Sequence, residues 1–113
     1  MLSIEQIEKA IQGEAKKIDE LVDEVRGAGD DAAIAEQNFK VSFAQQRLVA
    51  RAGEGRVTEA MADDMAVEGT AKERLAHNLA QSRLTTAREA MRAAQSRLDA
   101  LRTLAATHRA AGG

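Results

Sequence analysis

Basic side chains beside a glycine-rich break are the residues of this chain best suited to hold a ligand. Arg47 and Arg51 lie four residues apart, Lys40 precedes them on the same stretch, and Arg56 follows the break at residues 53–55. Such cations bind the phosphates of a nucleic acid without reading its sequence, and the amides of a turn can add hydrogen bonds. The alternative is a solvated helix end whose cations complement the helix dipole.

A second group of arginines follows the last apolar repeat of the chain. With Leu84 at position a of a heptad, Arg83 and Arg97 fall at g, and three further arginines fall at e. These arginines either pair with the acidic first helix or remain free for phosphates. The predicted DNA-binding residues are Lys40, Arg47, Arg51, Arg56, Arg83, Arg88, Arg97 and Arg102.

No group of residues in the sequence has the spacing of an enzyme site. His77 and His108 lack neighbours at the spacing of metal ligands, and the adjacent Asp63 and Asp64 point about 100° apart on a helix. The two aromatic residues, Phe39 and Phe43, occupy positions typical of a core, so they do not offer faces on which bases could stack. We expect no catalysis, no cofactor and no metal, and any DNA binding would be electrostatic.

Composition and charge point to one domain of long helices. The chain has 113 residues with no Cys, Pro, Trp or Tyr, and 30% of them are charged. Its net charge of −2 is unevenly spread: residues 1–31 carry −5, residues 32–56 carry +2, residues 57–73 carry −4 and residues 74–113 carry +5. No apolar stretch is long enough for a membrane span, and the acidic first residues do not resemble a signal peptide, so we expect a cytoplasmic protein.

Apolar spacing and helix-capping residues predict the order of the helices. A first helix is expected over residues 3–26, capped by Ser3 with Gln6 and ended by glycines at 27–29. A second helix follows Asp30 or Asp31, with Ile34, Val41 and Leu48 recurring every seven residues and Phe39 and Phe43 on an adjacent stripe. Residues 53–56 form a turn, and a helix continues or restarts from Val57. Its joint at Gly69 is either continuous or kinked, and the lone glycine favours near-continuity.

Two stretches have the 3–4 apolar spacing of a coiled coil: residues 4–25, where Glu14 fills the one missing position, and residues 84–105, where the repeat has no gap. Helices with one thin apolar stripe cannot cover it alone, so we expect copies of the chain to associate. The residues assigned to this oligomer seam are Ile4, Ile7, Ile11, Ile18, Leu21, Val25, Leu84, Met91, Leu98 and Leu101.

The expected fold is therefore all-α, a long antiparallel helical hairpin or coiled coil with an additional N-terminal helix, in an oligomer. Residues 1–29 form the acidic N-terminal helix, for oligomerisation or partner binding, and residues 30–113 form the hairpin with its turn near 53–56.

The run Leu48-Val49-Ala50-Arg51, the glycine turn and the helix ending at residues 98–104 resemble a known family. Over residues 32–109 the chain is similar to small helical phage proteins of DNA recombination cassettes, the UvsY-type recombination mediators. The resemblance implies a ring-like homo-oligomer that helps load a recombinase onto single-stranded DNA covered by a single-stranded-DNA-binding protein. It maps Arg51 onto the arginine of the family's Lys-Ala-Arg run, whereas Val49 replaces its lysine, so Arg47 or Arg56 would have to supply that charge.

These observations favour a non-enzymatic, oligomeric accessory protein of phage DNA recombination that binds single-stranded DNA and assists recombinase loading. It would work in the host cytoplasm if a phage encodes it. The alternative is a coiled-coil structural or adaptor protein, for phage assembly or protein–protein interaction, that binds no nucleic acid and pairs its arginines with its own acids.

Overall fold

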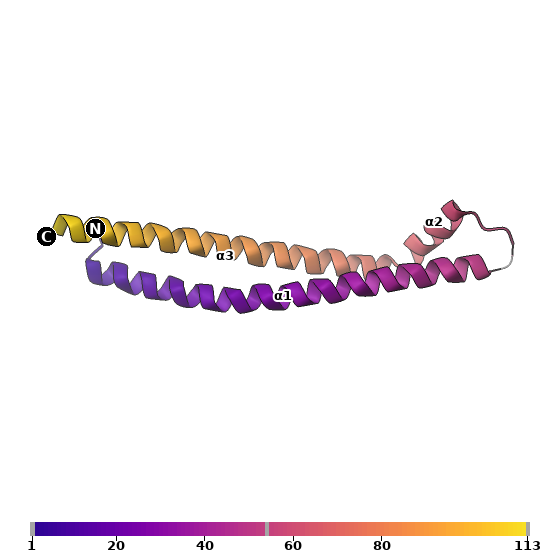
Figure 1. Ribbon diagram of the computed structural model, residues 1–113, viewed down its shortest axis with the longest axis horizontal. Helices are drawn as coiled ribbons and strands as arrows, with labels where there is room; N and C mark the ends of the chain where they lie inside the picture. Colours follow the sequence, from indigo (N-terminus) through magenta and orange to yellow (C-terminus); the bar gives the residue numbers. More distant parts are fainter. Residues whose placement is uncertain (1, 54, 113) are drawn as a thin grey trace. The chain divides into compact units, whose positions relative to one another are not determined.

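The computed structural model describes residues 2–53 and 55–112, and within these residues the chain is all-helical. Three helices follow one another: α1 (Ile4–Ala52), α2 (Glu59–Gly69) and α3 (Ala71–Gly112) (Figure 1). Ser3 and Gln6 form the expected capping box at the start of α1. The Gln6 side chain accepts a hydrogen bond from the Ser3 amide at 2.8 Å, and Ser3 Oγ accepts one from the Gln6 amide at 3.2 Å.

The helix break predicted at residues 27–29 is wrong, because α1 runs through these glycines without interruption. Gly27 and Gly29 remain helical, and neither adopts the left-handed conformation that would have ended the helix. Ala28 and Ala32 are both buried. A helical glycine costs only about 1 kcal/mol relative to alanine, so tertiary packing on both sides of residues 27–29 can outweigh it. Asp30 and Asp31 therefore lie inside a helix and cap nothing.

The predicted break after residue 52 is confirmed. α1 ends at Ala52, and Gly55 has a positive φ of 96°, a backbone conformation that favours glycine; Glu54 lies outside the described residues. The next helix begins two residues later than expected. Thr58 is its N-cap, with Oγ1 accepting a hydrogen bond from the Met61 amide at 3.1 Å.

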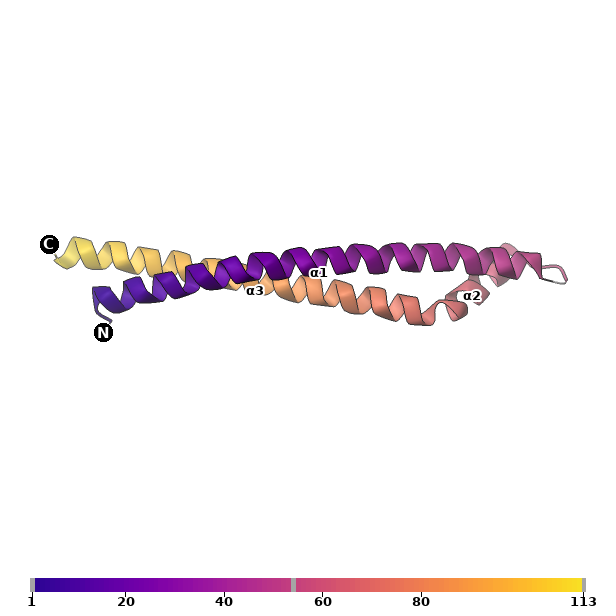
Figure 2. The ribbon, with the colours of Figure 1, turned by 90° about the horizontal axis from the view of Figure 1, so that it is seen from below.

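The near-continuity predicted through Gly69 is wrong, since α2 ends there and α3 starts at Ala71 (Figure 2). Thr70 separates them with φ −116° and ψ 19°. Its fully buried hydroxyl donates a 2.6 Å hydrogen bond back to the Ala66 carbonyl. This bond satisfies a carbonyl at the end of α2. An alanine side chain at Gly69 would come within 2.8 Å of the Gln46 side chain, so α2 approaches α1 closely at this point.

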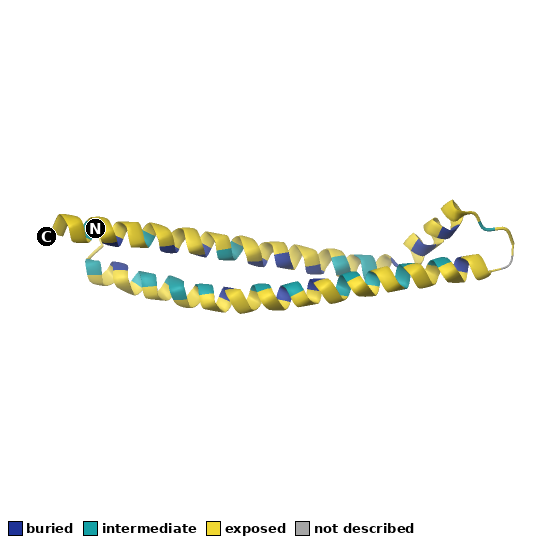
Figure 3. Cartoon of the chain, in the orientation of Figure 1, coloured by how far each residue is buried: buried dark blue, intermediate teal, exposed yellow. Residues whose placement is uncertain are grey.

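The described residues divide into two compact units. Unit 1 contains residues up to Gly27 and from Thr85 onward, so it pairs the start of α1 with most of α3. Unit 2 contains residues 28–84, with the rest of α1, all of α2 and the start of α3. Buried positions recur along each helix (Figure 3). Alanine makes up half of the buried residues in the described part of unit 1 and most of those in unit 2. Small side chains allow helix backbones to approach closely.

Candidate interaction surfaces

The basic cluster before the turn is paired with acids of α2. Arg47 binds Glu59 at 2.5 Å between Nη2 and Oε2, and its Nε lies 2.9 Å from Asp63 Oδ1. Arg51 also forms an ion pair with Glu59. Of the three turn arginines, only Arg56 has no ion pair among the described residues. Arg47 and Arg51 therefore join α1 to α2. Arg47 contacts two carboxylates, whereas Arg51 contacts only Glu59, which it shares with Arg47.

Lys40 is paired as well. Its Nζ lies 3.0 Å from Glu36 Oε1, one helical turn away. This hydrogen bond, together with the charge of Lys40, holds the pKa of the Glu36 carboxyl below its usual value. Both side chains are well exposed, so the pair marks a locally neutral part of the surface and adds little to stability.

The arginines of α3 fall into a paired set and an unpaired set. Arg97 Nε lies 3.1 Å from Glu14 Oε1, and Arg109 Nη2 lies 3.0 Å from Glu8 Oε1, both within unit 1. Both pairs join α3 to the acidic start of α1, the first of the two alternatives considered for these arginines. Within the part of the chain that the structure describes, four exposed arginines of α3 form no ion pair: Arg83, Arg88, Arg92 and Arg102.

The residues predicted to form a seam are covered within a single chain. None of the ten is exposed, and Ile7, Leu21, Leu84 and Leu98 are buried. The contact between copies that we expect for these residues stays a prediction. The seam positions that hold alanine on α3 are also buried, at Ala87, Ala94 and Ala105.

An aromatic cluster lines one groove of unit 2. Phe39 makes edge contacts with Phe43 and His77, with ring centroids 6.2 and 5.8 Å away, and the Arg74 guanidinium lies 6.0 Å from its ring centre. Both phenylalanines are half-buried. Their stripe faces the other helices of the unit, as core residues should. The groove has a volume of about 340 Å³ and is lined by Glu36, Phe39, Lys40, Phe43 and His77.

Sequence analysis missed that the other apolar stripe of this segment faces outward. Ile34, Val41 and Leu48 are 60%, 43% and 68% exposed. This segment has two neighbouring apolar stripes, and only one of them can face the interior. The stripe of Phe39 and Phe43, with the larger side chains, lies against the other helices. The polar residues beside the exposed stripe were the available signal, because Gln37, Asn38 and Gln45 do not suit a core.

The exposed stripe belongs to a larger surface, which we call the α1 face. Val41 lies nine residues, or about two and a half helical turns, from both Ala32 and Ala50, which are buried, so it points to the opposite side of α1. All members of the α1 face are exposed and uncharged: Ile34, Gln37, Asn38, Val41, Ala44, Gln45 and Leu48.

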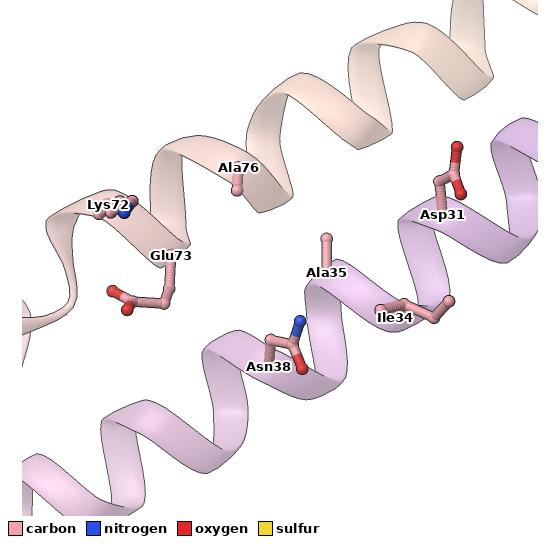
Figure 4. A pocket seen from close by; sticks show the side chains of 7 residues that line it. All are labelled: Asp31, Ile34, Ala35, Asn38, Lys72, Glu73 and Ala76. Carbon is pink, nitrogen blue, oxygen red and sulfur yellow. The ribbon is translucent and has the colours of Figure 1, made fainter.

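A shallow groove borders the α1 face, with a volume of about 240 Å³ (Figure 4). Its floor includes Ala35 of α1 and Ala76 of α3, which point toward one another. Asp31 and Asn38 of α1 and Lys72 and Glu73 of α3 supply polar groups at its edges. The groove is small and open, so it suits a protruding side chain better than a whole substrate.

Exposed apolar side chains are concentrated in unit 2. Among the described residues, nine of the twelve large hydrophobic side chains that are exposed belong to it, and three belong to unit 1. Unit 1 exposes Leu2, Val22 and Leu104. Unit 2 exposes Ile34, Val41, Leu48 and Val49 on α1, Met61, Met65 and Val67 on α2, and Leu75 and Leu79 on α3.

Within residues 2–53 and 55–112, no three side chains of the types that ligate metals gather in one place. None of the helices described here is long and apolar enough to cross a membrane. Comparisons with models of protein families, with curated proteins and with solved structures found no match.

Proposed function

We propose that this chain is a non-enzymatic helical interaction protein, the adaptor of the two functions considered above, and that it binds other proteins through unit 2. The observation that carries the proposal is the concentration of exposed large apolar side chains on all three helices of that unit. Large apolar side chains are costly to leave in water, and where they gather on one part of a surface they mark sites of protein contact. Exposed methionines such as Met61 and Met65 suit an adaptable interface.

The ion pairs support the same proposal. Two of the three turn arginines contact carboxylates of α2, and two arginines of α3 contact carboxylates of α1. Each of these pairs joins two different helices, so these charges have a structural role. The long antiparallel hairpin is part of the proposal. It is supported inside unit 1 by the opposite order of the paired residues, Glu8 with Arg109 and Glu14 with Arg97.

Site-specific photo-crosslinking in the cells that make the protein tests the adaptor function. A photoreactive residue at Leu79 should form adducts with protein, and Leu75→Gln should reduce them, because the two leucines are exposed one turn apart on α3. The matched control is a photoreactive residue at Thr86, exposed and seven residues further along α3. Equal adducts from both positions, or none from Leu79, would contradict the proposal.

Single-stranded DNA binding, with a role in recombinase loading, remains the second candidate. It is favoured by the exposed arginines of α3 that have no ion pair, Arg83, Arg88, Arg92 and Arg102. If it is correct, a fluorescent oligonucleotide is bound at about 50 mM salt and released near 200 mM salt, as counterion release requires.

Charge-matched variants distinguish a specific DNA-binding site from non-specific electrostatic attraction. An Arg88/Arg92/Arg102→Ala variant should lose the oligonucleotide, whereas an Arg47/Arg97/Arg109→Ala variant, which removes the same charge from paired positions, should keep most of its affinity. If the wild-type protein does not bind the oligonucleotide at low salt but forms protein adducts at Leu79, the adaptor function is supported and DNA binding is ruled out.

A further inference from the structure

We infer that the α1 face binds the same face of a second copy of this chain, with the two α1 helices antiparallel and Val41 at the centre of the contact. This inference rests on the proposed interaction function and names one of its partners. It uses the side of α1 opposite the buried Ala32 and Ala50, leaving Leu75 and Leu79 on α3 for a different protein.

The first argument is that the α1 face carries apolar groups and no charge. Three large aliphatic side chains recur every seven residues, the repeat that keeps a stripe facing a neighbouring helix as the two supercoil. The other members of the α1 face are one alanine and three amides, Ala44, Gln37, Asn38 and Gln45. An amide carries both a donor and an acceptor, so Asn38 and Gln45 can pair with amides of a second copy, and no like charges meet.

The second argument is charge complementarity, which selects both the occupant and its direction. The α1 face begins one turn after Asp30 and ends one turn before Arg51. In an antiparallel pair, Asp30 of each copy lies beside Arg51 of the other, whereas a parallel pair would bring like charges together. Asp30 is exposed and has no ion pair among the described residues. Arg51 is 46% exposed and its guanidinium has donors beyond those that bind Glu59.

The third argument is the symmetry of the spacing. Ile34 and Leu48 each lie seven residues from Val41, and Asp30 and Arg51 lie eleven and ten residues from it. A two-fold axis beside Val41 therefore sets Ile34 of one copy near Leu48 of the other and closes both ion pairs at once. Self-complementarity of this kind is what a closed dimer requires of a surface. Lys40, beside the face, is neutralised by Glu36 of its own chain.

Molecular mass in solution tests the contact. The wild-type chain should sediment as a dimer, and Val41→Arg should be monomeric over the same concentrations, because two arginines would meet at the centre. The control is Val22→Arg, the same substitution at another valine of α1, which is 39% exposed and lies in unit 1. This variant should remain dimeric. Circular dichroism must show the same helix content in all three proteins.

Cysteine cross-linking tests the direction, since the chain has no cysteine of its own. With a short bis-maleimide, a mixture of Ile34→Cys and Leu48→Cys proteins should cross-link to each other, while Ile34→Cys alone should not. Cross-linking of Ile34→Cys to itself would show a parallel pair and overturn the inference. A wild-type monomer at every concentration would also overturn it, but protein adducts at Leu79 would then still support the adaptor function.

Discussion

At the scale of single residues, most of the basic side chains near the turn form ion pairs with carboxylates of the same chain. Lys40, Arg47 and Arg51 were all expected to face a phosphate backbone, yet each contacts a carboxylate of its own chain. The sequence shows which charges are present but does not show which of them meet in space. Arg47 reaches residues 12 and 16 positions away, because α2 folds back beside the end of α1.

The Lys40–Glu36 pair gives a pH prediction. Lys40→Ala should raise the pKa of Glu36 toward its ordinary value, as followed by carbon NMR of the carboxyl group, because the hydrogen bond and charge that lower it are lost. A carboxyl whose folded pKa is lowered contributes stability above its unfolded pKa and loses it as the pH falls through the folded pKa. Lys72→Ala, elsewhere in unit 2, is the control and should leave the titration of Glu36 unchanged.

Thr70 offers a second test, because it is fully buried and holds the α2–α3 junction through one hydrogen bond. Thr70→Val keeps the shape and removes the hydroxyl, so unfolding in urea should show a loss of about 1 kcal/mol. Thr103→Val, at an exposed position of α3, should change stability much less. Equal effects would show that the hydroxyl does not stabilise this junction.

At the scale of helices, the sequence predicted the all-helical class, the first cap and the break after residue 52. It failed at glycine positions, where local preference and tertiary packing compete. Gly27 and Gly29 lie in a helix whose flanking residues are packed, while Gly69 ends one because Thr70 turns the chain. Local sequence could not show this packing, since the neighbour of Gly29 is Leu84, far along the chain, whose Cδ1 lies 3.9 Å from where a Cβ of residue 29 would be.

Continuity of α1 can be tested at Gly27, where nothing lies within 4 Å of an added methyl group. Gly27→Ala should stabilise the protein by about 0.5–1 kcal/mol, since alanine favours a helix interior. Gly55→Ala should destabilise it, because Gly55 has a positive φ. Thermal unfolding distinguishes the two, and destabilisation by Gly27→Ala would mean that α1 ends there after all.

The seam of α3 gives a matched pair of leucines. Leu98 is 7% exposed, whereas Leu104 on the same helix is 43% exposed. Leu98→Ala should cost about 2–4 kcal/mol of unfolding free energy, and Leu104→Ala should cost less than about 1 kcal/mol. Urea unfolding followed by circular dichroism measures both, and similar costs would contradict the burial of this seam.

At the scale of the whole molecule, apolar burial and not charge holds each unit together. Most partners in the ion pairs of the described residues are well exposed, apart from the Arg47 side chain at 34% and the Glu14 side chain at 19%, and exposed pairs contribute little. Two arginines of α3 contact acids of α1, which was one of the two alternatives that the sequence left open. The residues assigned to the oligomer seam are covered within one chain, and their contact between copies stays a prediction. The sequence could not show which apolar stripe between residues 34 and 48 would remain outside, because both stripes have helical spacing.

The response to salt follows from this balance. Raising the salt concentration from about 0.1 M to about 1 M should shift the midpoint of thermal unfolding by only a few degrees, because screening removes only weak surface attractions. Differential scanning calorimetry at both concentrations checks this at one protein concentration, since association also affects the midpoint. A collapse of stability at high salt would assign the main role to the ion pairs.

The alanine at so many buried positions has a consequence for how this protein can vary. Ala62, Ala66 and Ala94 have no exposed surface at all, and nearly every other amino acid is larger than alanine. A replacement there almost always adds bulk and forces neighbouring backbones apart. Natural variants should therefore accumulate on the outward sides of the helices, while these inner sites keep only the smallest side chains.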